Sequence, residues 1–170
     1  MEIAKDMIKE YKIDVLLAHT DEKGIEAYYS PKEQTLYINE SHITEQAEEE
    51  GMPVEDYAQI TFAHEIGHIT DEDLPDIDMR ISNYWDMIDC LGYKNKTFDL
   101  IKELRMQAEK NAWDRAVLYI KERLKDKLPS IRKKALRNSD LNLEIVRDLI
   151  KIKHEAKANR ERLENLKKQI

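Results

Sequence analysis

Residues 61–70 read TFAHEIGHIT and contain the pattern H-E-x-x-H, as His64, Glu65 and His68. On a helix, residues four positions apart lie on one face, so both imidazoles can reach a single metal ion. Glu65 lies about 100° further round the helix, from where its carboxylate can reach a water molecule at that ion. Two nitrogen ligands, one further protein ligand and an open water position are typical of a catalytic zinc site, in which Glu65 would act as the base.

The residues around the motif distinguish a metal site from a surface helix that carries two histidines by chance. A helix that is apolar nearly all round is buried, and buried imidazoles and carboxylates need partners. Gly67 costs about 1 kcal/mol inside a helix, so we expect another element to approach closely there. The apolar residues of this segment are Ala58, Ile60, Phe62, Ala63, Ile66 and Ile69.

The length and the cysteine count limit the class of protein. The chain has 170 residues, enough for one domain or for a domain with an appendage. Its longest aliphatic run, residues 15–18, is far too short to span a bilayer, and residues 1–11 lack the apolar region of a signal peptide. Cys90 is the only cysteine, which excludes an internal disulfide, and we expect a buried thiol there. These features predict a cytoplasmic protein.

The charge is distributed unevenly along the chain. Residues 1–100 contain 24 acidic and 8 basic side chains, whereas residues 101–170 contain 11 acidic and 20 basic ones. Such a split indicates either a basic surface for an acidic partner or two parts of the chain that attract each other. The basic segment 121–137 could contact nucleic-acid phosphates. Because it lacks interleaved aromatic residues, a solvated face or pairing with the acidic part is the favoured interpretation.

Hydrophobic periodicity and turn residues predict an α+β chain with a small sheet and a mostly helical C-terminal half. Strand 35–39 is expected to be an edge to which an extended substrate could add. The acidic run 71–76 is expected to be a solvated loop, and Pro129 to separate a long helix from those that follow. The expected strands are residues 13–18, 25–29 and 35–39, and the expected helices are residues 2–11, 54–70, 77–92, 97–127, 130–138 and a last one capped by Asp140.

The last predicted helix has a pattern of its own. Its seam positions are spaced alternately by four and three residues, which is the a/d series of a coiled coil. Asn159 would be the polar seam residue that sets the register. The series predicts a parallel homodimer through residues 145–170, or packing of the tail on a matching face elsewhere. Its members are Ile145, Leu149, Ile152, Ala156, Asn159, Leu163, Leu166 and Ile170.

Two histidines need one further protein ligand to form a catalytic zinc site. The metzincin pattern would place a third histidine six residues after the second, where this chain has Leu74, so that branch is excluded. A downstream acid must serve. Glu109 is the best candidate, because Ala112 and Ala116 share its helix face and allow close approach to the metal helix. Glu103 is the competitor, but it lies about 120° away round the helix, on a more charged side.

These motifs resemble those of the ImmA/IrrE family of zinc-dependent metallopeptidases over residues 13–125. Residues 63–68 match the family's A-H-E-x-G-H, which is a specific pattern, whereas the strand end at residues 38–39 and an E-x-x-A-x-x-x-A pattern from Glu109 are weaker matches. The resemblance implies a zincin-like fold with a small antiparallel sheet beside the metal helix. It implies a zinc ion held by His64, His68 and Glu109, with Glu65 as the base.

The resemblance also implies a protein substrate. Members typically occur in bacteria, their phages and mobile elements, and cut a helix-turn-helix repressor, so we expect a zinc endopeptidase that makes a regulatory cut. The peptidase domain is expected at residues 1–128, with a helical extension at 129–170 for dimerisation or partner binding. His42, Tyr84 and His154 are candidate donors to the oxyanion. The alternative is a non-proteolytic DNA- or protein-binding module that retains a zincin-like fold.

Overall fold

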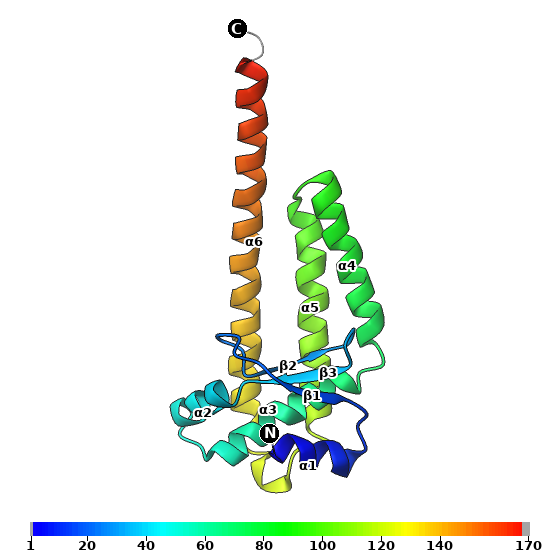
Figure 1. Cartoon of the computed structure of the whole chain (residues 1–170), viewed down its shortest axis with the longest axis vertical. Helices are drawn as coiled ribbons and strands as arrows, with labels where there is room; N and C mark the ends of the chain where they lie inside the picture. The colour runs from blue at the N-terminus through cyan, green and yellow to red at the C-terminus, as the bar shows by residue number, and fades with distance from the viewer. Residues whose placement is uncertain (1, 168–170) are drawn as a thin grey trace. The chain divides into compact units, whose positions relative to one another are not determined.

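The computed structural model describes residues 2–167 and shows a mostly helical α+β chain with a three-stranded sheet, as predicted (Figure 1). The strands are β1 (Leu16–His19), β2 (Ala27–Ser30) and β3 (Thr35–Ile38). The helices are α1 (Glu2–Tyr11), α2 (Glu40–Glu49), α3 (Val54–Ile69), α4 (Leu74–Leu91), α5 (Asn95–Ala116), the 3₁₀ helix η1 (Glu122–Leu124) and α6 (Leu128–Lys167). No helix within residues 2–167 is both long and apolar enough to cross a membrane.

The contacts divide the chain into two compact units, which are described separately below. The first unit comprises the residues up to 75 together with residues 108–133. The second comprises residues 76–107 and the chain from residue 134 onward. Both α5 and α6 therefore contribute to both units. The expected domain boundary between residues 128 and 129 stays a prediction.

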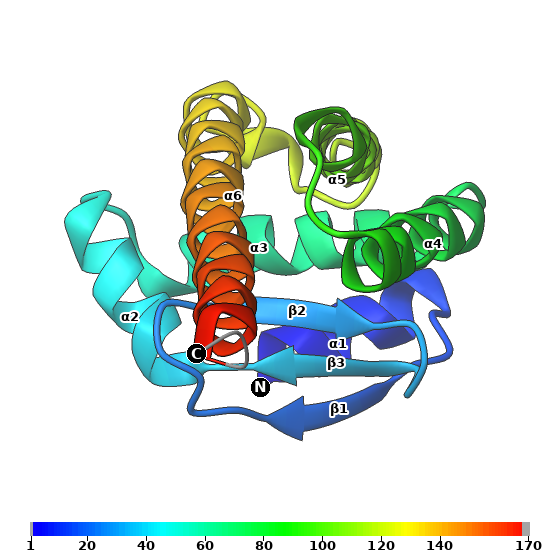
Figure 2. The same ribbon diagram turned by 90° about the horizontal axis from the view of Figure 1, so that it is seen from above.

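The sheet of the first unit is mixed, in the order β1-β3-β2 (Figure 2). β3 pairs with β1 in parallel and with β2 in antiparallel orientation. The prediction of an antiparallel sheet is therefore wrong. β1 and β2 run in opposite directions and do not pair with each other; β3 lies between them, so it must be parallel to one of the two. The expectation of an edge strand at residues 35–39 is wrong for the same reason, since β3 is the central strand and β2 is an edge.

α3 fills the core of the first unit and is buried nearly all round, as the apolar flanks of the motif predict. Ile60, Ala63 and Ile66 are fully buried, and so are Leu36 and Ile38 of β3. The adjacent α2 was not predicted from the acidic sequence of residues 41–50. Its N-terminus is fixed by Asn39, whose side chain accepts a hydrogen bond from the backbone N–H of His42 at 3.1 Å.

Two helix boundaries differ from the prediction. α5 ends at Ala116 rather than near residue 127, although residues 117–128 contain no glycine or proline. Tertiary contacts end the helix, because Ile120 and Leu124 are buried and the hydroxyl of Tyr119 donates to that of Thr70 at 3.1 Å. Pro129 does not interrupt a helix but lies in the first turn of α6, where its missing N–H costs nothing.

The second unit is held by apolar residues of α4 and α5. Ile81 and Ile88 of α4 are buried, and the ring of Trp85 meets that of Phe98 edge-on at 5.9 Å. The free thiol of Cys90 is exposed, so the expectation of a core thiol is wrong. Two helical steps separate Cys90 from Ile88, which turns the cysteine about 200° away from the buried face.

Candidate metal centre

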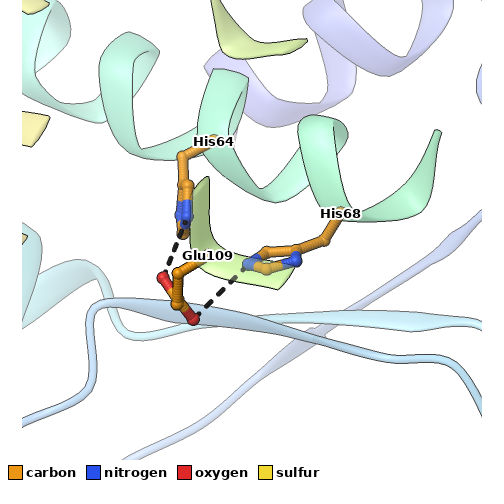
Figure 3. A group of neighbouring side chains, drawn as sticks. All are labelled: His64, His68 and Glu109. Atoms are coloured by element: carbon orange, nitrogen blue, oxygen red, sulfur yellow. Dashed lines mark ion pairs between the residues drawn. The ribbon is translucent and has the colours of Figure 1, made fainter. Parts of the chain in front are cut away.

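His64 and His68 of α3 and Glu109 of α5 converge within the first unit (Figure 3). One potential ligand atom from each residue lies within 4.8 Å of the others. The Nε2 atom of His64 lies 3.4 Å from Oε2 of Glu109, and Nε2 of His68 lies 3.7 Å from Oε1 of the same carboxylate. Glu103, the competing acid, is exposed and does not belong to this group. The three residues therefore form a group that could hold a metal ion.

A close approach between α3 and α5 brings Glu109 to the histidines. A Cβ atom added to Gly67 would lie 2.9 Å from the carbonyl carbon of Ala112 and closer still to its oxygen, and such distances are not compatible with packing. Ala112 and Ala116 are fully buried, so small side chains on α5 permit this approach. Gly67 of α3 is thus required by the packing, as its sequence context suggested.

The electrostatic surroundings of the two histidines differ. Their side chains are only 13% and 14% exposed. Burial alone would lower the pKa of His64, but the carboxylates of Glu109 and Glu65 outweigh it and raise this pKa to about 9. Burial lowers the pKa of His68 below its usual value. Without a metal ion, the imidazole of His64 is therefore positively charged at neutral pH, with a proton on both ring nitrogens, and that of His68 is neutral.

Glu65 is buried beside this group and is oriented by two hydrogen bonds. Its Oε2 atom accepts from the backbone N–H of Tyr29 in β2 at 2.9 Å. Its Oε1 atom lies 3.2 Å from Nδ1 of His64, which suits an Nδ1–H donor. A neighbouring acid, Glu26, accepts a hydrogen bond from the hydroxyl of Tyr57 at 3.1 Å, and burial raises the pKa of Glu26. Glu65, the base predicted from the sequence, is therefore held between α3 and the edge strand β2.

Trp113 of α5 packs on the group of His64, His68 and Glu109, which is called the metal group below. Its ring stacks on that of His64 with centroids 4.2 Å apart, and only 3% of the residue is exposed. The aromatic and aliphatic stripe of α5 was interpreted as core, and Trp113 does belong to the core. Its contact with His64 adds a second constraint on the imidazole, besides the hydrogen bond to Glu65.

Asp71 forms a buried polar cluster next to the metal group. Its side chain is fully buried and accepts a hydrogen bond from Nδ2 of Asn111 at 3.0 Å. A guanidinium nitrogen of Arg115 lies 3.2 Å from its other oxygen. The expectation that the acidic run is a solvated loop is therefore wrong for Asp71. Sequence analysis missed Asn111 and Arg115, although their four-residue spacing on a helix is a signal that both can reach one partner.

The three candidate oxyanion donors belong to different parts of the chain. His42 lies at the start of α2, where its Nδ1 atom is 3.1 Å from the carboxylate of Glu45. Tyr84 and His154 belong to the second unit, where the ring of His154 lies 6.5 Å from that of Tyr93. The identity of an oxyanion donor stays a prediction for all three.

The basic segment 121–137 is partly neutralised within the first unit. Both terminal nitrogens of Arg123 donate to the carboxylate of Asp56. Arg132 pairs with Asp114 at 2.7 Å. Asp56 belongs to the acidic part of the chain, so for Arg123 the favoured interpretation of internal pairing agrees with the structure.

The potential ligand atoms of His64, His68 and Glu109 indicate whether the group fits a metal ion. Nε2 of His64 is buried and makes no hydrogen bond of good geometry among the described residues, although Oε2 of Glu109 lies 3.4 Å from it. Nε1 of Trp113 and Nε of Arg147 are unsatisfied in the same way, so the convergence of the three ligand residues, rather than this atom alone, supports an ion at the site. Two imidazole nitrogens and one carboxylate oxygen are a ligand set that zinc uses, and they leave a fourth position open. The residues of this site therefore fit a zinc ion. Comparison of the chain with protein-family models, with curated proteins and with solved structures finds no match.

Proposed function

We propose that this protein is a zinc-dependent endopeptidase with its active site at His64, Glu65, His68 and Glu109. The observation that carries the proposal is the convergence of His64, His68 and Glu109, beside the buried carboxylate of Glu65, in a group that could hold a metal ion. A buried carboxylate next to this group, that of Glu65, supplies a base. A closed structural site would need a fourth protein ligand, whereas the group contains three residues.

A zinc ion held there would supply Lewis acidity, which polarises a carbonyl group and makes a water molecule more acidic. Glu65 takes a proton from the attacking water and passes it to the leaving amine. The hydrogen bonds from Tyr29 and His64 orient this carboxylate, and each of its oxygens keeps a further lone pair for the water. The Nδ1–H of His64 donates to Glu65, which leaves Nε2 for the ion.

The outer edge of β2 offers a binding position for an extended peptide. The backbone N–H of Asn39 donates to the carbonyl of Glu26, and in an antiparallel pair every second residue bonds to the partner strand. Tyr28 and Ser30 therefore direct their backbone groups to β3. Ala27 and Tyr29 then direct their backbone groups to the unpaired edge, where the N–H of Tyr29 meets Glu65. A peptide that pairs with Ala27 would pass beside the base. We therefore assign to β2 the role that the sequence suggested for residues 35–39.

For the substrate we propose a protein that receives a regulatory cut, such as a helix-turn-helix transcriptional repressor. This part of the proposal rests on the resemblance of residues 63–68 to the ImmA/IrrE pattern. Non-proteolytic binding of nucleic acid is not favoured, since Arg123 and Arg132 of the basic segment already have acidic partners in the chain.

Cleavage of a peptide library from a bacterial proteome digest tests the proposal. The zinc-loaded protein should generate new peptide termini, and a chelator should stop it. Glu65→Gln should keep zinc but lose cleavage by at least about a hundredfold, because an amide cannot accept the proton from water. Glu72→Gln, which changes an exposed acid of the same region, is the matched control. Absence of cleavage by the zinc-loaded protein, or cleavage by Glu65→Gln at the parent rate, would contradict the proposal.

A further inference from the structure

One face of α6 contacts other residues of the second unit. Lys102 of α5 lies 2.7 Å from Asp140 and also pairs with Glu144. Arg147 lies 2.6 Å from Asp99, and its guanidinium group lies 5.2 Å from the centre of the Phe98 ring. The partly buried residues of α6 on this side are Leu136, Asp140, Leu143, Arg147, Ile150 and His154. They are spaced by four and three residues in turn, so they form one stripe along the helix, the contact face.

A second apolar stripe of α6 lies on the opposite side of the helix. At about 100° per residue, Ile145, Leu149, Ile152 and Leu163 lie roughly 140–160° round the helix from Arg147. Their exposed fractions are 58%, 61%, 61% and 58%. The contact face therefore does not cover them, and within the second unit the predicted alternative, packing of the tail on a matching face, is excluded for these four residues.

We infer that this exposed stripe, the seam, binds the seam of a second copy of the same chain in a parallel two-stranded coiled coil. α6 continues without interruption through residue 167 (Figure 1), and its sequence after Pro129 contains no glycine or proline. The stripe has the four-three spacing that keeps apolar residues facing a partner helix. Asn159, which is exposed at a seam position, would pair with itself and set the register. Ile170 lies outside the described residues, and the seam is argued here from residues 145–163.

Charges beside the seam favour a second copy in parallel orientation. With Leu149 at position a, Asp148 and Glu155 occupy g positions, and Lys153 and Arg160 occupy the following e positions. In a parallel pair, Asp148 of each chain faces Lys153 of the other and Glu155 faces Arg160, which are two attractive pairs, whereas Arg162 faces Lys167 and repels it. None of the four side chains in the attractive pairs forms an ion pair with another residue in 2–167. In an antiparallel pair, Lys153 and Arg160 would face other basic e positions and repel them.

Sedimentation of the full chain across micromolar concentrations tests the association. The protein should be a dimer that dissociates on dilution. Ile152→Asp should make it a monomer, because it would bury an aspartate in the seam. Lys151→Asp places the same side chain on the neighbouring exposed residue outside the seam, and should leave the dimer intact. A protein that is monomeric at every concentration overturns the inference, as does a dimer that survives Ile152→Asp. Circular dichroism should show equal helix content in all three proteins.

Disulfide formation tests the orientation in a Cys90→Ser background. In a parallel pair, residue 149 of one chain lies next to residue 149 of the other, so Leu149→Cys should form a cross-linked dimer on mild oxidation. Lys151→Cys, outside the seam, is the control and should cross-link far less. In an antiparallel pair, an a position faces a d position, so residue 163 lies near residue 152 of the other chain; Leu149→Cys alone would then stay uncross-linked while the double variant Ile152→Cys, Leu163→Cys would cross-link. That pattern would overturn the parallel arrangement.

Discussion

At the scale of single residues, the protonation of His64 is the property of the metal group most open to measurement. Its imidazole lies between the carboxylates of Glu65 and Glu109, which raise its pKa to about 9. A histidine must be neutral at the nitrogen that binds a metal. A zinc ion at Nε2 would therefore take the place of a proton that two carboxylates hold in the metal-free protein.

We predict that zinc binding at pH 7 releases close to one proton from His64. The raised pKa means that the proton is present below about pH 9 and lost above it, so zinc affinity should rise about tenfold per pH unit from pH 6.5 to 8. Titration calorimetry in buffers of different ionisation enthalpy measures the release. Glu65→Gln removes one of the two carboxylates and should reduce the release. Zinc affinity that does not change with pH would contradict this assignment.

Glu109 is predicted to be the third ligand. Glu109→Ala should lower zinc affinity by at least about a hundredfold while α5 stays folded, because alanine is a good helix former and one of three protein ligands is lost. Glu103→Ala, on the same helix, should leave zinc affinity unchanged, since that residue is exposed and outside the metal group. A chelator competition assay compares the two variants. The reverse result, with zinc lost in Glu103→Ala and kept in Glu109→Ala, would show that the face of α5 is assigned wrongly.

The residues of the metal group could be selected from the sequence because helical spacing is local information. His64 and His68 are one turn apart, and Glu109 shares a face with Ala112. The role of Asp71 could not be read in the same way. Its burial depends on Asn111 and Arg115, which approach it from α5, and an acidic run in isolation looks like a solvated loop.

At the scale of secondary structure, the contact of α3 with α5 determines where the third ligand lies. Gly67 touches the backbone of Ala112, so the two helices are separated by little more than main-chain atoms. The distance of Glu109 from the two histidines therefore depends on the absence of a side chain at Gly67.

Gly67→Ala is predicted to destabilise the protein by about 1–3 kcal/mol, as overpacking of a core does. Alanine is about 1 kcal/mol better than glycine in a helix, so an exposed site would show the opposite sign. Zinc affinity should fall as well, because α5 must move away from α3. Denaturant unfolding and zinc titration measure the two effects. Ala112→Gly should not rescue either, since the clash involves backbone atoms of Ala112, and a stabilised Gly67→Ala variant would contradict the close approach.

Element boundaries were less predictable than the elements themselves. α3 was predicted within one residue because Pro53 and the acidic run 71–76 mark its ends. Tertiary contacts end α5 at Ala116. Residues 117–128 contain no glycine or proline, so nothing in the local sequence marks this end. The order of the strands was not predictable either, because short strands joined by turns can pair in more than one order.

At the scale of the whole molecule, the metal group joins two segments of the first unit that are distant in sequence. His64 and His68 lie in the part up to residue 75, and Glu109 lies in residues 108–133, which return to it after the chain has formed much of the second unit. Sequence spacing could suggest Glu109, but only the packing of the first unit brings it to the histidines. The exposed seam of α6 is likewise a property of the described structure, because its heptad spacing alone does not say which side α5 covers.

Zinc anomalous diffraction from crystals of the full chain tests the central claim most directly. The account predicts one strong peak per chain, bonded to Nε2 of His64, Nε2 of His68 and a carboxylate oxygen of Glu109 at about 2.0–2.2 Å. A peak bonded to other residues would contradict it. So would the absence of any peak between His64 and Glu109 in crystals grown with zinc in excess over the protein.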